Sequence, residues 1–297
     1  MKQFLTNLLL FLLAFSVIYT ILITGILFIT SSAGFTIPPE KNIIVIGDSC
    51  TACAIDDSIF TSAFNISEGG SAYIYAYVKL RKFIQENPHV DTVIVSFHGD
   101  SIHRQMDDYV TGARYMMNYM PSYFSLFHKE EIVLFARNTN FLPAFLRIPI
   151  RSILIFKNFI TGQERTYRDL QIGGYDRLEY HKLDDDIAIK KTIPFEYSQY
   201  QLQYLQKIAD LSRRYGFELI LFSTPIYNPE IYGNRTALLD FYNNYFQDVR
   251  FIDYSDFSLP RNGYADTIHL NYRGAQIFSQ YLQDNHESIF LTEQVSR

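Results

Sequence analysis

The feature that most constrains the fold is a short segment at residues 42–53, NIIVIGDSCTAC. Its apolar run, residues 43–46, predicts a short buried strand. The run stops at Gly47, and Asp48 and Ser49 follow at once. In an α/β protein a serine in that place lies at the carboxyl edge of the sheet, on the turn into a helix, where its Oγ can act as a nucleophile. Ser49 is therefore the first candidate for a reactive side chain.

Further apolar segments alternate with helical patterns along the chain. Strands are predicted at residues 62–66, 91–97, 218–223 and 249–253. Helices are predicted at 72–87, 202–212, 238–246 and 271–284, and a short helix followed by a loop at 51–60. Strands that alternate with helices predict an α/β fold, a three-layer α/β/α sandwich around a five-stranded parallel sheet of flavodoxin-like type. The strand before Ser49 should be central, in the order 2-1-3-4-5, which puts Ser49 where the strand order reverses. Gly216 is well placed to cap the helix that precedes it.

The amino-terminal part of the chain has a different character. Residues 4–29 are mainly Leu, Ile, Phe and Val and carry no charge, and that length crosses a bilayer whose hydrocarbon core is about 30 Å thick. A cleavable signal peptide usually has a shorter apolar region, although residues 31–33 are small enough to be cut. We expect an uncleaved single-pass anchor at 1–36 and an extracytoplasmic domain, periplasmic or extracellular, at 37–297.

The alternation of strand and helix patterns is lost in the middle of this domain. An insertion over the carboxyl edge of the sheet is predicted at about 101–194. Within it, residues 141–159 are apolar but carry three basic side chains, which favours a buried covering helix over a helix that lies on a membrane surface. The net charge of −5 leaves no basic surplus for a nucleic-acid partner.

One of the seven histidines stands out by its context. Asp266 precedes His269 by three residues, just before the last predicted helix, so that one turn brings the carboxylate to one ring nitrogen. The other ring nitrogen is then available to Ser49. The carboxylate would fix the tautomer and stabilise the imidazolium that forms when His269 takes the serine proton. Ser49, His269 and Asp266 are therefore the predicted catalytic triad.

Taken together, these segments resemble the SGNH/GDSL hydrolase superfamily. The matching blocks are IGDS at 46–49, NISEGG at 65–70, and DTIH at 266–269 with LNYRGA after it. The resemblance covers residues 43–284 apart from the insertion. It implies that Ser49 is the nucleophile and that Asp266 and His269 complete the triad.

The resemblance also implies an oxyanion hole. Its donors would be the backbone N–H of Ser49 and that of a glycine in the second block, with Gly69 preferred slightly over Gly70. The third block departs from the family, because SFHGD at 96–100 lacks the asparagine that donates there. His98 either donates from its ring in that place or is an ordinary polar loop residue.

The anchor makes the chain similar to superfamily members that work on cell-envelope polymers, such as alginate-acetylation proteins, DltD-type proteins and peptidoglycan O-acetyltransferases. The resemblance implies a membrane-anchored serine esterase or O-acyltransferase acting on acetyl esters of envelope or exported polysaccharide, with a membrane protein as the source of the acyl group in the transfer case. The alternative is a non-catalytic SGNH-like protein that binds such polymers or organises their assembly. No cofactor and no metal ion is expected.

The two cysteines, Cys50 and Cys53, form a CxxC motif directly after the candidate serine. A redox role lacks a thioredoxin-like context, and a zinc site would need two more ligands, which are not evident nearby in the sequence. The favoured interpretation is that both are small residues filling the first turn of the helix.

Overall fold

The computed structural model describes residues 1–31, 34–151, 173–183, 195–229 and 235–290. The chain divides into two compact units. One comprises Met1–Phe35 with Thr111–Gln171, and the other Thr36–Val110 with Ile172–Arg297. The larger unit contains the sheet and every residue of the predicted triad, whereas the domain limits and insertion limits drawn from the sequence remain predictions.

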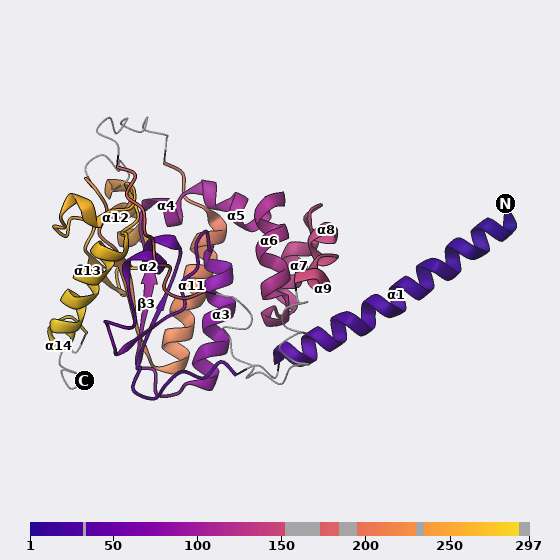
Figure 1. The fold of residues 1–297 in the computed structure, drawn as a ribbon, viewed down its shortest axis with the longest axis horizontal. Coiled ribbons are helices and arrows are strands. Elements are labelled where there is room, and N and C mark those ends of the chain that lie inside the picture. Colours follow the sequence, from indigo (N-terminus) through magenta and orange to yellow (C-terminus); the bar gives the residue numbers. More distant parts are fainter. Residues whose placement is uncertain (32–33, 152–172, 184–194, 230–234, 291–297) are drawn as a thin grey trace. The chain divides into compact units, whose positions relative to one another are not determined.

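The larger unit is built on five parallel strands in the order β2-β1-β3-β4-β5, as predicted. Figure 1 shows strand β3 with helices on both of its sides. The strands are β1 (Ile43–Ile46), β2 (Ala63–Asn65), β3 (Thr92–Ser96), β4 (Glu218–Ser223) and β5 (Arg250–Asp253). Strand β1 pairs with β2 on one side and β3 on the other, with Ile44 opposite both Phe64 and Val93. The carboxyl end of β1 therefore lies at the reversal of strand order, where open α/β sheets bind their ligands.

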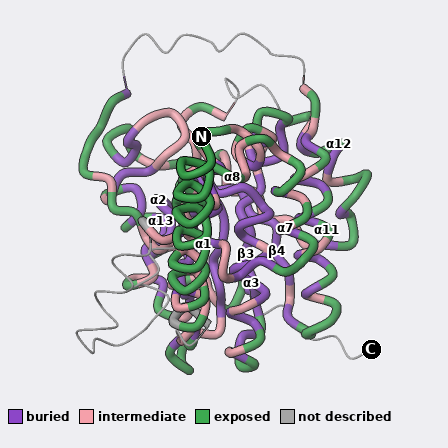
Figure 2. The backbone as a smooth tube through the Cα atoms, turned by 90° about the vertical axis from the view of Figure 1, so that its right-hand side faces the viewer, coloured by how far each residue is buried: buried purple, intermediate pink, exposed green. Residues whose placement is uncertain are grey.

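Helices cover both faces of this sheet and complete the three layers. Ile43, Val45 and Phe222 belong to one buried cluster with Phe278 and Leu282 of α13. Because side chains alternate along a strand, the intervening strand residues face the other side, where α3 (Tyr73–Glu86) packs against α11 (Gln199–Tyr215). Figure 2 shows the strands as buried chain inside a partly exposed shell.

The helices of the larger unit begin and end at identifiable caps. The Asn271 side chain accepts from the Arg273 and Gly274 N–H groups at the start of α13 (Tyr272–Asp284). Gly216 ends α11 with φ +81°, as predicted, and its N–H donates to the Ser212 carbonyl. The other helices are α2 (Ser49–Ala54), α4 (Gly99–Ile102), η1 (Arg104–Met106), α5 (Asp107–Thr111), α12 (Arg235–Tyr245), η4 (Arg261–Gly263) and α14 (His286–Phe290).

The smaller unit is helical in its described residues. Its elements are α1 (Lys2–Ser31), α6 (Ala113–Tyr123), η2 (Phe124–Leu126), α7 (Lys129–Ala136), α8 (Phe141–Phe145) and α9 (Ile148–Arg151). The single helix considered for 141–159 is instead two short helices, α8 and α9, and its remainder lies outside the described residues. The Tyr19 ring of α1 contacts the Phe145 ring of α8, with centroids 5.5 Å apart.

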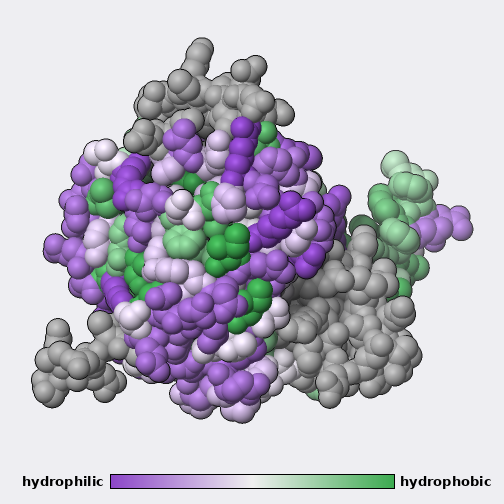
Figure 3. Space-filling view, turned by 60° about the vertical axis from the view of Figure 1, so that its left-hand side comes forward, coloured by the Kyte–Doolittle hydropathy of each residue, from purple (hydrophilic) through white to green (hydrophobic). Residues whose placement is uncertain are grey.

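Helix α1 is long and apolar enough, by length and composition, to cross a membrane over Lys2–Phe28. Most of its large side chains are exposed, and in Figure 3 its surface is hydrophobic with hydrophilic atoms at its end. Exposed apolar surface on this scale is costly in water.

Candidate active site

Ser49 is placed by the junction between β1 and α2. Strand β1 ends at Ile46, and the Asp48 side chain caps α2 by accepting from the Cys50 N–H at 3.0 Å. A Cβ on Gly47 would lie 2.2 Å from the Ser96 Cβ, so only glycine permits this close approach of β1 to β3. Ser49 is half-buried at the first position of the helix, as its place after the strand predicted.

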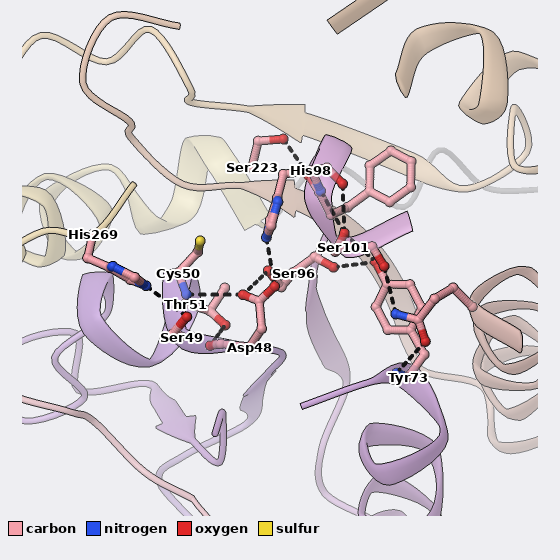
Figure 4. A network of polar contacts seen from close by, with 12 residues as sticks. Asp48, Ser49, Cys50, Thr51, Tyr73, Ser96, His98, Ser101, Ser223 and His269 are labelled. Atoms are coloured by element: carbon pink, nitrogen blue, oxygen red, sulfur yellow. Dashed lines mark hydrogen bonds and ion pairs between the residues drawn. The ribbon is translucent and has the colours of Figure 1, made fainter. Parts of the chain in front are cut away.

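His269 and Asp266 lie in the loop before α13, and their local turn is built by the aspartate. Its Oδ1 accepts from the Ile268 N–H at 3.0 Å and the His269 N–H at 2.9 Å. The same carboxylate reaches the His269 ring, with Oδ2 2.9 Å from Nδ1. The other ring nitrogen, Nε2, lies 2.8 Å from Ser49 Oγ (Figure 4). The structure thus brings the three predicted residues into one hydrogen-bonded row.

The carboxylate in this row is held in its charged form. Burial raises the pKa of Asp266, but the hydrogen bonds from His269 and the Ile268 N–H outweigh it and bring the pKa below its ordinary value. An ionised Asp266 favours the tautomer with the proton on Nδ1, which leaves Nε2 to accept from Ser49. Chemically, the row can remove the serine proton and hold it on an imidazolium.

Gly69, the preferred oxyanion glycine, lies beside the serine. A Cβ built on Gly69 would be 3.7 Å from the Ser49 Cβ. Its loop is fixed from two sides, because the Glu68 N–H donates to the Gly47 carbonyl at 3.0 Å and the buried Lys79 ammonium donates to the Ile66 carbonyl at 2.6 Å. The loop between β2 and α3 is thus held against the turn that carries Ser49.

His98 has a different partner from the one that its predicted role requires. Its Nε2 lies 2.7 Å from Oδ2 of Asp48, and its side chain is 23% exposed. Burial lowers the pKa of His98, but the Asp48 charge outweighs this and raises it well above its ordinary value. The raised pKa favours the charged form of the ring, which is engaged with the Asp48 carboxylate, and the role of His98 as an oxyanion donor stays a prediction.

Cys50 and Cys53 are both buried free thiols in α2. Burial raises the pKa of each thiol, which disfavours the thiolate that redox chemistry requires. Their place in the helix fits the favoured interpretation, since the two side chains are 4% and 2% exposed in its packed face.

Within the predicted insertion, sequence reasoning missed the backbone contacts of one segment to the β2–α3 loop and to α2. Residues 173–183 run past this loop and this helix, with the Gly174 N–H donating to the Ser67 carbonyl and the Asp176 N–H donating to the Ala52 carbonyl, each at 2.8 Å. Gly173 has φ +114°, and a Cβ there would lie 2.5 Å from the Ile66 carbonyl oxygen. The only sequence signal for this contact is the Gly173-Gly174 pair.

A cavity of about 50 Å³ also escaped prediction. It is lined by neighbours of the two reactive groups, Cys50 next to Ser49 and Ile268 next to His269, and by His98. Its other walls are Gly99, Asp100, Ser223, Ile226, Pro229, Arg235, Leu238, Asp253 and Ser255. Arg235 pairs with Asp253 at 2.8 Å, so the charges at that end are balanced.

No protein-family model and no curated protein sequence matches the chain. Among solved structures, the chain is similar to a "putative platelet activating factor" from Streptococcus pneumonia, at 14% identity and a TM-score of 0.41 over 92% of this chain and 97% of that one. It is also similar to a "GDSL-like lipase" from Bacteroides thetaiotaomicron VPI-5482, at 10% identity and a TM-score of 0.36 over 91% of this chain and 98% of that one. A third similar structure is a "putative acylhydrolase" from Bacteroides fragilis NCTC 9343, at 12% identity and a TM-score of 0.35 over 87% of this chain and 93% of that one.

Proposed function

We propose that the protein is a serine enzyme of the SGNH/GDSL type that cleaves or transfers acyl esters. The observation that carries this proposal is the row from Asp266 through His269 to Ser49, with contacts of 2.9 and 2.8 Å. A serine hydroxyl is a weak nucleophile by itself, and an oriented imidazole within hydrogen-bond reach is what activates it.

The proposed reaction has two halves. In the first, Ser49 Oγ attacks the ester carbonyl while His269 Nε2 takes its proton, and Asp266 stabilises the imidazolium. The tetrahedral intermediate then expels the alcohol, which takes the proton from His269 and leaves an acyl-serine. In the second half, His269 takes a proton from water or from a sugar hydroxyl, and the oxygen of that group attacks the acyl carbon. The bond to Ser49 Oγ then breaks, and Oγ regains the proton from His269, which gives hydrolysis with water and acyl transfer with the sugar.

The oxyanion formed in both halves needs hydrogen-bond donors. We assign the backbone N–H groups of Ser49 and Gly69 to this role, which the position of Gly69 beside Ser49 supports. The His98 ring, the third predicted donor, would have to leave Asp48 in order to take part.

The proposed substrates are acetyl esters of cell-envelope or exported polysaccharide. We assign the short acyl group to the small cavity next to Cys50 and Ile268, the chain neighbours of Ser49 and His269, because it offers about 50 Å³ with apolar walls at Ile226 and Leu238. The apolar helix α1 supports a single-pass anchor, and the place of the domain outside the cytoplasmic membrane is part of the proposal. In the transfer case, a membrane protein would deliver the acyl group.

The test is turnover of p-nitrophenyl acetate and of an acetylated glycan by the full-length protein in detergent, with water and sugar acceptors compared. Ser49→Ala should abolish turnover above background, while Ser258→Ala, at an exposed loop serine, should leave it unchanged. Equal turnover by wild type and Ser49→Ala would overturn the proposal. A folded wild type with no turnover would favour the non-catalytic polymer-binding alternative.

A further inference from the structure

Three side chains with metal-binding donor atoms meet on the side of α2 away from His269. They are Asp48, Cys50 and His98, and one donor atom of each lies within 4.8 Å of the others. Figure 4 shows the Cys50 sulfur and the His98 ring on one side of this turn, with Ser49 directed to the other. Cys50 has no part in the proposed triad, and the His98 ring is turned to Asp48.

We propose that Asp48, Cys50 and His98 form a binding site for a divalent transition metal ion of the zinc type. A carboxylate oxygen, a thiolate sulfur and an imidazole nitrogen are each ordinary zinc ligands. The Asp48 carboxylate is already ionised, and as the ion binds, the Cys50 thiol and the protonated His98 ring each release a proton to solvent. The three ligands then supply two negative charges and so balance a divalent cation. This inference uses neither Ser49 nor His269, although two of its ligands, Cys50 and His98, line the cavity proposed for the acyl group.

Two of the ligands are fixed by their surroundings. Asp48 Oδ1 accepts from the Cys50 N–H and from Ser96 Oγ, each at 3.0 Å, and these bonds leave Oδ2 directed at His98. The His98 backbone N–H donates to Ser101 Oγ at 3.0 Å, which anchors the base of that side chain at the end of β3. Such outer contacts orient the ligands of a metal site before the ion binds.

The ligand spacing is near that of a tetrahedral site and requires small movements. Zinc bonds of about 2.0–2.3 Å put tetrahedral ligand atoms roughly 3.3–3.6 Å apart. The His98 Nε2 to Asp48 Oδ2 contact must therefore open from 2.7 Å, and the widest separation must close from at most 4.8 Å. Rotation of the Cys50 and His98 side chains about their own bonds is sufficient for changes of this size.

The cavity supplies an approach for the ion and room for a fourth ligand. Cys50 and His98 both line it, and Asp100 adds a carboxylate to its wall. The cationic Arg235 in the same wall is paired with Asp253 at 2.8 Å. Three protein ligands beside an open space are typical of zinc sites that keep an exchangeable position, in contrast to closed structural sites with four protein ligands.

Cys53 provides a matched control for this inference. It belongs to the same CxxC motif and the same helix and is 2% exposed. Among the described residues it belongs to no cluster of three metal-binding donors. If metal binding is lost when Cys50 is replaced but kept when Cys53 is replaced, the proposed site is distinguished from non-specific binding of metal by free thiols.

The test is titration of chelator-treated, full-length protein in detergent with Co²⁺, followed by its thiolate-to-cobalt charge-transfer absorption. We expect one equivalent to produce the absorption and Zn²⁺ to displace it. Cys50→Ser should abolish the absorption, and His98→Ala or Asp48→Asn should weaken Co²⁺ binding at least about tenfold. Asn keeps the helix cap while it removes the carboxylate charge.

Cys53→Ser and Ser49→Ala should both retain the absorption. The proposal is overturned if folded wild type gives no charge-transfer absorption with excess Co²⁺, if Cys50→Ser retains it, or if Cys53→Ser loses it. Because the readout is spectroscopic, its outcome is independent of whether Ser49 acts on esters.

Discussion

Among its described residues, the larger unit holds two aspartate–histidine pairs, one on each side of the turn that carries Ser49. In the first, Asp266 and His269 lie three residues apart in one loop, and their side chains are 33% and 18% exposed. In the second, Asp48 and His98 come from the ends of two neighbouring strands, and their side chains are 11% and 23% exposed. The residue types are the same, but the atoms in contact differ.

That difference decides what each imidazole can do. The Asp266 carboxylate holds Nδ1 of His269 and leaves Nε2 facing a hydroxyl at 2.8 Å. The Asp48 carboxylate holds Nε2 of His98 itself, and the group nearby is a buried thiol. An aspartate–histidine contact is therefore not a catalytic signature on its own, because the free nitrogen and its neighbour determine the chemistry.

The largest effect is expected at the first pair. Asp266→Asn should lower kcat by roughly 10³–10⁴-fold, because the amide can still accept from the backbone N–H groups but no longer stabilises the imidazolium. The measurement is ester turnover beside a thermal unfolding curve, with Asp256→Asn at an exposed position as the control. Turnover within tenfold of wild type would show that this pair is no more catalytic than the second.

A buried lysine, Lys79, lies near the same edge of the sheet as the two aspartate–histidine pairs, and it makes the stability of the fold depend on pH. Lys79 is fully buried, and burial lowers the pKa of its ammonium from 10.5 to about 8. Between these two pH values Lys79 keeps its proton in the unfolded chain but has released it in the folded chain. The folded state therefore becomes more stable relative to the unfolded state as the pH rises. The free energy of unfolding of wild type should therefore rise by roughly 3 kcal/mol relative to Lys79→Met between pH 8 and 10.5.

Denaturant unfolding at several pH values checks this prediction. Lys82→Met, on the same helix but with its ammonium 2.6 Å from Glu86, is the matched control for the loss of a lysine side chain from α3. A constant difference between wild type and Lys79→Met across the range would contradict it.

At the second pair, the expected effect is on stability more than on turnover. His98→Ala leaves Asp48 with its bonds from Cys50 and Ser96 but removes a hydrogen bond between charged groups, and should cost about 2 kcal/mol of unfolding free energy. Turnover per folded molecule should change less than tenfold. A loss near a hundredfold, without loss of stability, would instead make the His98 ring an oxyanion donor.

The smallest effect is expected in the cavity beside both pairs. Leu238→Ala should enlarge it and shift the preferred p-nitrophenyl ester from acetyl toward longer acyl chains by a few-fold in relative kcat/KM. Leu239→Ala is the control, because Leu239 is 37% exposed on the same helix whereas Leu238 is 5% exposed. If the two variants show the same dependence of kcat/KM on the length of the acyl chain, the cavity does not select the substrate.

The parts of the fold that could be predicted are those with local or periodic signals. The strands at 43–46 and 218–223 match the structure residue for residue, and Gly216 ends its helix as expected. The row of Ser49, His269 and Asp266 was accessible because the Asp266 turn is local and because parallel strands gather their carboxyl ends at one edge.

The parts of the fold and the site that could not be predicted depend on contacts between distant residues, which leave no periodic pattern in the sequence. Asp48 and His98 are fifty positions apart in the chain, and only the pairing of β1 with β3 brings them together. Asp48 stands two residues before Cys50 in the sequence, but the approach of His98 to Asp48 could not be predicted for this reason. The passage of residues 173–183 across the site loops is equally nonlocal, since it depends on backbone hydrogen bonds to Ser67 and Ala52.

The most direct test of the central claim is the reaction of full-length protein with a fluorophosphonate, with the modified residue located by mass spectrometry. We predict a single adduct on Ser49 that is lost in His269→Ala and retained in His89→Ala, a change at an exposed histidine. An adduct on another serine, or an adduct on Ser49 that forms equally fast without His269, would contradict the account.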